Sequence, residues 1–222
     1  MDIQLNNIEV RVLGSLIEKE ITTPEYYPMS LNALTNACNQ KSNRDPVMDL
    51  SESDVQAAVD TLRDKRLSWQ FSSAGARVPK FEHNLKSLFT LSKEEIAVLC
   101  VLMLRGPQTI GEIRTRTDRM CSFSSLEEAE HTIRNLIERE AGPFIAELPR
   151  QYGRKENRYM HLFAGMPEMS AIQEKYDTVR YSTEKSVSSI DRIESLEAEV
   201  ASLKTELSDL RSEFVEFKKQ LE

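Results

Sequence analysis

Hydrophobic positions near the start of the chain follow a helical spacing that recurs 86 residues later. Apolar residues at i, i+3, i+4 and i+7 are typical of an amphipathic helix. The first stripe is formed by Val10, Val12, Leu13, Leu16 and Ile17. The second has the same spacings at Ile96, Val98, Leu99, Leu102 and Met103. The chain therefore contains an internal repeat, and each copy opens with a helix.

Two further helices follow in each copy. Ser30 precedes a short apolar stripe in the first copy and Thr109 precedes one in the second, where a hydroxyl can accept from free N–H groups of a helix N-terminus. Residues 51–66 and 125–139 carry longer stripes, each opened by serine and acidic residues. Each copy is therefore predicted to contain three helices.

After each third helix the apolar period changes from about 3.6 to 2, which indicates strands. Residues 67–83 predict one β-hairpin, with Trp69 expected in the core, and residues 144–163 predict another. Three helices followed by a hairpin is the winged-helix arrangement. The predicted fold is mainly α with small β-hairpin wings, in two tandem winged-helix domains at residues 1–90 and 91–165.

The tail carries a heptad repeat. Its a and d positions are Ile193, Leu196, Val200, Leu203, Leu207, Leu210, Phe214, Phe217 and Leu221. Glutamates at g precede lysine or arginine at the following e positions, which favours a parallel coiled coil at residues 193–222. Residues 166–192 are predicted to be a helical linker with a Ser-rich hinge. The alternative is that the apolar stripe folds back on the winged helices.

Composition limits the partners and the compartment. The formal net charge is −7, so any contact with nucleic acid must come from a local basic patch, and no membrane partner is expected. An acidic N-terminus without an apolar stretch is unlike a signal peptide, and no apolar run approaches the about 20 residues of a membrane-spanning helix. Cys38, Cys100 and Cys121 fit reduced, buried thiols. These features predict a cytoplasmic protein.

No catalytic motif stands out. His83, His131 and His161 lie far apart, and no metal-binding, dinucleotide-binding or nucleophile motif occurs. We therefore expect a protein that is not an enzyme and that needs no metal or other cofactor. An enzyme with a carboxylate site assembled in space is a remote alternative.

One motif resembles a known family. The segments TTPEYYP at residues 22–28, SLNAL at 30–34 and NACNQKSNRDPV at 36–47 resemble the YceH family of uncharacterised bacterial proteins. The resemblance continues in LRGPQT at 104–109, Arg114, Arg116, Thr117, LPR at 148–150 and RYMHL at 158–162. It implies tandem winged helices and a bacterial cytoplasmic protein, and it implies no substrate.

Two clusters of basic residues are candidates for phosphate contacts. The larger closes the second helix of the second repeat and continues on its wing: Arg114, Arg116, Arg119, Arg150, Arg154, Lys155 and Arg158. The smaller flanks the first winged helix: Lys41, Arg44, Arg77 and Lys80. Basic wings can contact phosphates or the minor groove. Alternatively, these side chains are solvated or paired with Glu112, Asp118, Glu147 and Glu156.

Acidic residues open both third helices, which disfavours standard base readout in the major groove and is also accounted for by helix capping. The leading hypothesis is a parallel homodimer that binds double-stranded DNA through its wings, as a transcriptional regulator. The rival is a protein–protein adaptor resembling the tandem winged-helix subunits of bacterial chromosome-segregation complexes.

Tyr26 and Tyr27 either fill a gap between helices or form a partner surface. Residues 43–46 are expected to form an Asx-type turn.

Overall fold

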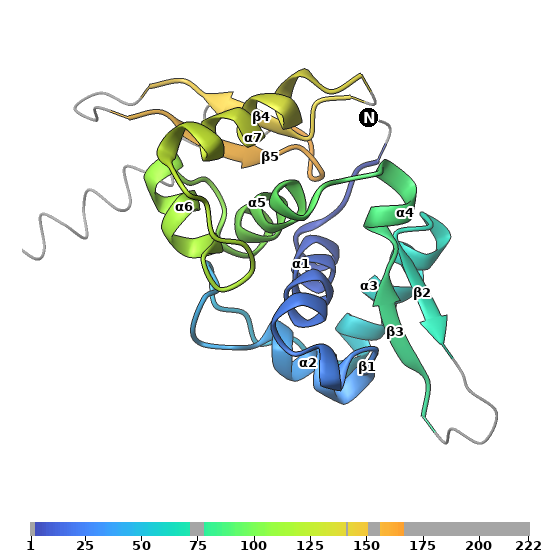
Figure 1. The fold of residues 1–222 in the computed structure, drawn as a ribbon. Helices are drawn as coiled ribbons and strands as arrows, with labels where there is room; N and C mark the ends of the chain where they lie inside the picture. Colours follow the sequence, from blue (N-terminus) through green and yellow to red (C-terminus); the bar gives the residue numbers. More distant parts are fainter. Residues whose placement is uncertain (1–2, 72–77, 141, 151–155, 167–222) are drawn as a thin grey trace, which may run out of the picture. The chain divides into compact units, whose positions relative to one another are not determined.

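The computed structural model describes residues 3–71, 78–140, 142–150 and 156–166, which are mainly helical with small antiparallel hairpins (Figure 1). The first repeat contains α1 (Asn7–Thr22), η1 (Pro24–Tyr26), β1 (Met29–Ser30), α2 (Leu31–Cys38), α3 (Glu52–Asp64), β2 (Ser68–Phe71) and β3 (Lys80–His83). After α4 (Leu85–Phe89), the second contains α5 (Lys93–Arg105), α6 (Ile110–Thr117), α7 (Leu126–Glu138), β4 (Ile145–Leu148) and β5 (Arg158–His161). The predicted order of three helices and a hairpin, occurring twice, is confirmed.

Polar side chains begin the helices where the sequence predicts. Ser30 Oγ accepts from the backbone N–H of Ala33 at 3.3 Å, and Thr109 Oγ1 accepts from that of Glu112 at 3.3 Å. An acidic residue completes the cap of α3, because Asp54 accepts from the N–H of Ser51 at 2.9 Å. The capping role predicted for these acids is therefore confirmed at Asp54.

In each repeat, a very short third segment pairs with one strand of the hairpin. The first sheet has the strand order β1-β3-β2, with Met29 opposite Phe81 and Trp69 opposite Glu82. In the second repeat β4 pairs with β5, and Gln108 forms an isolated bridge to Tyr159. Both extra partners directly precede the helix that follows. The sequence did not predict them, because two residues are too short for an alternating pattern.

The prediction that Trp69 lies in the core is wrong. Ser68 is fully buried, whereas Trp69 and Phe71 are 49% and 53% exposed. The core face of the hairpin instead holds Ser68 with Phe81 and His83 of β3. Because side chains alternate between faces, a shift of one residue reverses the whole strand. The two aromatic rings therefore face outward.

Tyr26 and Tyr27, which were expected either to fill a gap between helices or to form a surface, lie in different environments. The Tyr27 hydroxyl accepts a hydrogen bond from the backbone N–H of His83 at 2.7 Å, so this half-buried ring joins η1 to the sheet. Tyr26 is 74% exposed. Tyr27 therefore fills the gap between elements, while Tyr26 remains on the surface.

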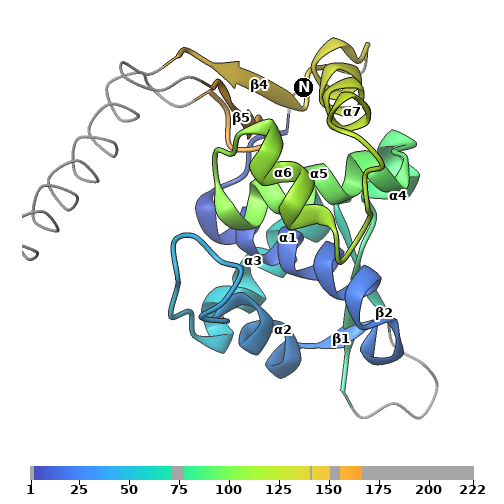
Figure 2. The same cartoon turned by 60° about the vertical axis from the view of Figure 1, so that its left-hand side comes forward.

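The two repeats pack against each other along α1 and α5, and residues 1–166 form one compact unit (Figures 1 and 2). The close approach depends on Gly14, where an added Cβ would lie 3.0 Å from a Leu104 methyl carbon and 3.1 Å from Met103 Cβ. All three cysteines are free and buried, as predicted. The predicted linker and coiled coil, at residues 166–192 and 193–222, lie outside the described residues from position 167 onward.

Candidate anion-binding site between the repeats

The loop between α2 and α3 joins the first repeat to the second. The Asn39 side chain closes its base, since its amide donates to Leu50 O and accepts from Leu50 N, both at 2.8 Å. At the tip, the N–H of Asp45 donates to the carbonyl of Leu104 at 2.9 Å. The Asn43 side chain, expected to form an Asx-type turn, accepts from the Arg105 guanidinium. This loop is therefore a structural bridge to the end of α5.

A buried ion pair lies beneath this bridge. Arg44 donates to both carboxylate oxygens of Glu18, Nη1 to Oε1 at 3.1 Å and Nη2 to Oε2 at 2.5 Å, and both side chains are fully buried. Arg119 of the second repeat donates to the same carboxylate. Burial acts to raise the pKa of Glu18, but the hydrogen bonds and charge of Arg44, followed by the charges of Arg119 and Lys19, hold that pKa below its usual value. Glu18 thus links both repeats.

Arg44 is consequently a correction to the predicted phosphate contacts. Its side chain has no exposed surface, and it also donates to the carbonyl of Ala37 at 2.9 Å. A guanidinium that is buried and paired in this way holds the loop in place and cannot reach a polyanion. The sequence could not show this, because Glu18 and Arg44 lie far apart in the chain.

Three arginines are partly or largely exposed above this ion pair, and together we call them the arginine seam: Arg105, Arg116 and Arg119. The side chain of Arg116 is 31% exposed and that of Arg119 is 41% exposed. Burial, then the charges of Arg116 and Arg119, lower the pKa of Arg105 from its usual value, although an arginine remains charged. The guanidinium groups therefore lie close enough to repel one another.

Carboxylates neutralise this region only in part. Arg44 and Arg119 share Glu18, while Arg116 and Arg158 share Glu112 at 3.6 and 3.0 Å. Arg105 donates to the neutral amide of Asn43. Among the groups named in this paragraph, five arginines face two carboxylates, Glu18 and Glu112. The seam is therefore a locally positive patch on a chain of net charge −7.

The remaining predicted phosphate contacts are scattered. Arg114 is exposed but lies about 200° around α6 from Arg116, on another flank of the helix. Arg158 is partly buried and also donates to the carbonyl of Pro107 at 2.8 Å. Lys41 and Arg150 are exposed, and Lys80 is exposed on β3 of the first sheet. Arg77, Arg154 and Lys155 lie outside the described residues. The structure thus brings Arg44, Arg116, Arg119 and Arg158 together and supplies Arg105, which the sequence did not single out.

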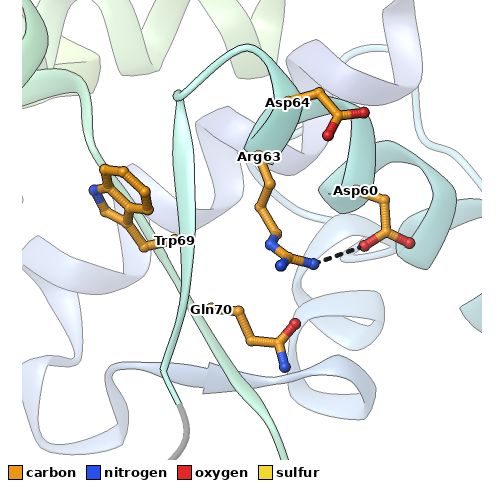
Figure 3. Close-up of a pocket in the computed structure, with 5 residues that line it drawn as sticks. All are labelled: Asp60, Arg63, Asp64, Trp69 and Gln70. Atoms are coloured by element: carbon orange, nitrogen blue, oxygen red, sulfur yellow. Dashed lines mark hydrogen bonds and ion pairs between the residues drawn. The ribbon is translucent and has the colours of Figure 1, made fainter.

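The third helices present acidic residues to solvent. On α3, Asp60 and Asp64 are exposed, and Asp60 pairs with Arg63 at 3.1 Å. Together with Arg63 of α3 and with Trp69 and Gln70 of β2, they line a pocket of about 440 Å³ (Figure 3). Figure 3 shows the Trp69 ring on the opposite side of the strand from the other groups. This surface does not suit a phosphate backbone.

Within the described residues, no group of His, Cys, Asp and Glu is placed to hold a metal ion. None of the described helices is long and apolar enough to cross a membrane. His161 is buried in β5, and its Nδ1 has no hydrogen-bond partner among the residues that the structure describes.

Fold and site together define a mainly helical protein of two packed repeats with small hairpins and an arginine patch where the repeats meet. The chain belongs to the family described as "Protein of unknown function, DUF480", whose model matches residues 5–154. It is 51% identical over 222 residues, the full length of both chains, to the UPF0502 protein of Geotalea uraniireducens. The UPF0502 protein of Geobacter sulfurreducens is 49% identical over the same full lengths. That of Vibrio campbellii is 47% identical over 205 residues, which cover 90% of this chain and 92% of its own. The family expected from residues 22–47, under its YceH name, is confirmed.

Proposed function

We propose that the protein binds double-stranded DNA through the arginine seam, as a cytoplasmic, non-enzymatic homodimer of tandem winged helices. The observation that carries this proposal is the convergence of Arg105, Arg116 and Arg119 at the junction, where cations exceed carboxylates. Guanidinium groups donate several hydrogen bonds in a planar fork that matches phosphate oxygens. Partly exposed arginines can turn toward a phosphate while the buried Arg44 holds the loop in place.

Contacts of this kind position a protein on DNA and carry little sequence information. The acids at the starts of α3 and α7 make base readout by these helices unfavourable. A parallel coiled coil of residues 193–222 would relate two such units by a two-fold axis, which suits a two-fold symmetric DNA site. The function proposed is therefore a regulator or architectural protein that depends mainly on backbone contacts.

The test is fluorescence anisotropy of a labelled duplex with the full chain. At about 0.15 M salt, loss of one phosphate contact weakens binding about fivefold, so Arg105→Gln and Arg116→Gln should each have this effect. Arg134→Gln on the exposed side of α7 is the matched control, because it removes one charge outside the seam. Equal affinities of all three variants would contradict a role for the seam.

The adaptor hypothesis is supported by a different observation, the exposed acidic surface of α3 at Asp60 and Asp64. Such a surface fits a basic protein partner. If no duplex binds at any salt concentration, the adaptor becomes the favoured function. A defined partner that the wild type retains and the Asp60→Lys, Asp64→Lys double variant loses would then establish it.

A further inference from the structure

The outer face of the first sheet combines two aromatic rings with two charges. The register places Trp69 opposite Glu82 and Phe71 opposite Lys80. Since paired residues project from the same face, these four side chains form one group. The opposite face carries the buried Phe81 and His83. The group therefore lies on a sheet face that is turned away from the core.

Both rings are open to solvent. Trp69 is 49% exposed and Phe71 is 53% exposed. Neither forms a ring pair with another of the residues that the structure describes. They lie two residues apart on one strand, so their attachment points are about 7 Å apart. β2 is also an edge strand, so a chain can approach the rings from the side.

The charges beside the rings complement a nucleic acid. Lys80 is exposed and makes no ion pair within the described part of the chain, so its ammonium group is available to a phosphate. Glu82 can accept from an exocyclic amino group of a base. The four paired positions on this face carry two aromatic rings and two charges, while the exposed aliphatic Val78 lies outside the pairing, two residues before Lys80. Flat rings beside a cation are the features by which proteins stack unpaired bases.

This face is separate from the arginine seam. In Figure 1, α6 and the loop after α2 lie on one side of α1, and the first sheet lies on the other. The acids of the α3 pocket also lie across the strand from Trp69 (Figure 3). A ligand on the outer face therefore needs neither of those sites.

We propose that the outer face of the first sheet binds single-stranded nucleic acid, with one base stacked on Trp69, the next on Phe71, and Lys80 contacting the backbone. DNA and RNA share this chemistry, because both have flat bases and a phosphate backbone. The assignment is independent of duplex binding at the seam.

Trp69 is the only tryptophan in the chain, so its fluorescence reports directly on this face. Titration of the full chain with a twelve-nucleotide deoxythymidine strand should quench it saturably, and a uridine strand run in parallel tells whether DNA or RNA binds more tightly. Phe71→Ala should weaken the binding about tenfold, the loss typical of one stacked base. Lys80→Gln should weaken it less and make it less dependent on salt.

Two controls separate base stacking from simple charge attraction and from binding at the seam. Inorganic polyphosphate should not quench Trp69, because it has no bases. Arg105→Gln, which weakens duplex binding if the seam is correct, should leave quenching by the single strand unchanged. The proposal is overturned if no single strand quenches Trp69, if a duplex or polyphosphate quenches it equally, or if Phe71→Ala binds like the wild type. A protein ligand for this face is then favoured.

Discussion

At the scale of single residues, burial decides what a charge does. Arg44 and Arg119 both contact Glu18, yet only Arg119 retains exposed surface. The sequence correctly identified the helix caps, because capping depends on neighbours within three or four residues. It could not separate the buried Arg44 from the exposed arginines, since that difference depends on packing between distant segments.

Removing the Glu18 charge should be costly. Glu18→Gln leaves Arg44 buried without a counter-charge, and loss of one partner of a buried pair typically costs about 3 to 5 kcal/mol. Urea denaturation measures the change in the free energy of unfolding. Glu25→Gln, at an exposed glutamate, is the control and should change it by less than about 0.5 kcal/mol. A similarly small loss for Glu18→Gln would mean that the pair does not hold the junction.

His161 should make stability depend on pH. Burial lowers its pKa from 6.5 to about 4. Between these values the unfolded chain binds a proton that the folded chain does not, so stability decreases as the pH falls through this window. The contribution lost between pH 7.5 and pH 5 is about 2 kcal/mol. Denaturation at both pH values should show this loss in the wild type, and His161→Leu should reduce it by that amount. An unchanged pH dependence in the variant would contradict the assignment.

At the scale of elements, periodicity predicted three helices and a hairpin in each repeat, because each of these has enough residues for a pattern to repeat. It did not predict the shorter η1 and α4. It failed where the pattern was short or had two possible phases. Trp69 and Phe71 alternate with polar residues, but the core face is set by contacts such as that of Ser68 with Val59 O at 3.5 Å. The sequence pattern therefore indicated a strand without indicating which face is buried.

The contact between α1 and α5 should tolerate no added bulk at Gly14. Gly14→Leu places a side chain against Leu104 and Met103, and overpacking of this kind typically costs about 1 to 3 kcal/mol. Gly111→Leu is the matched control in α6, because a Cβ there meets only Thr109 Oγ1 at 4.0 Å. Chemical denaturation of both variants measures the difference. Equal stabilities would show that the helices can separate without cost.

At the scale of the whole molecule, the two repeats act as one unit because α1, α5 and the loop after α2 connect them. The repeat was visible in the sequence, but the seam was not, since it joins Arg105 at the end of α5 to Arg116 and Arg119 of a later segment. This arrangement adds Arg105 to the predicted phosphate contacts Arg116 and Arg119 at the junction.

The proposed dimer is tested by mass in solution. Light scattering of the full chain should give twice the chain mass of 25.4 kDa. Leu203→Asp places a charge at a d position of the heptads, so it should give the single-chain mass. Equal masses for both proteins would contradict the coiled coil.

The central claim is that the arginine seam contacts DNA phosphates, and the salt dependence of duplex binding tests it most directly. Three contacts at about −0.9 each predict a slope of log K against log salt of about −3 per protomer. The Arg105→Gln, Arg116→Gln double variant should reduce it to about −1, while Arg134→Gln should keep the wild-type slope. A double variant with the wild-type slope, or a wild type without salt-dependent binding, would contradict the claim.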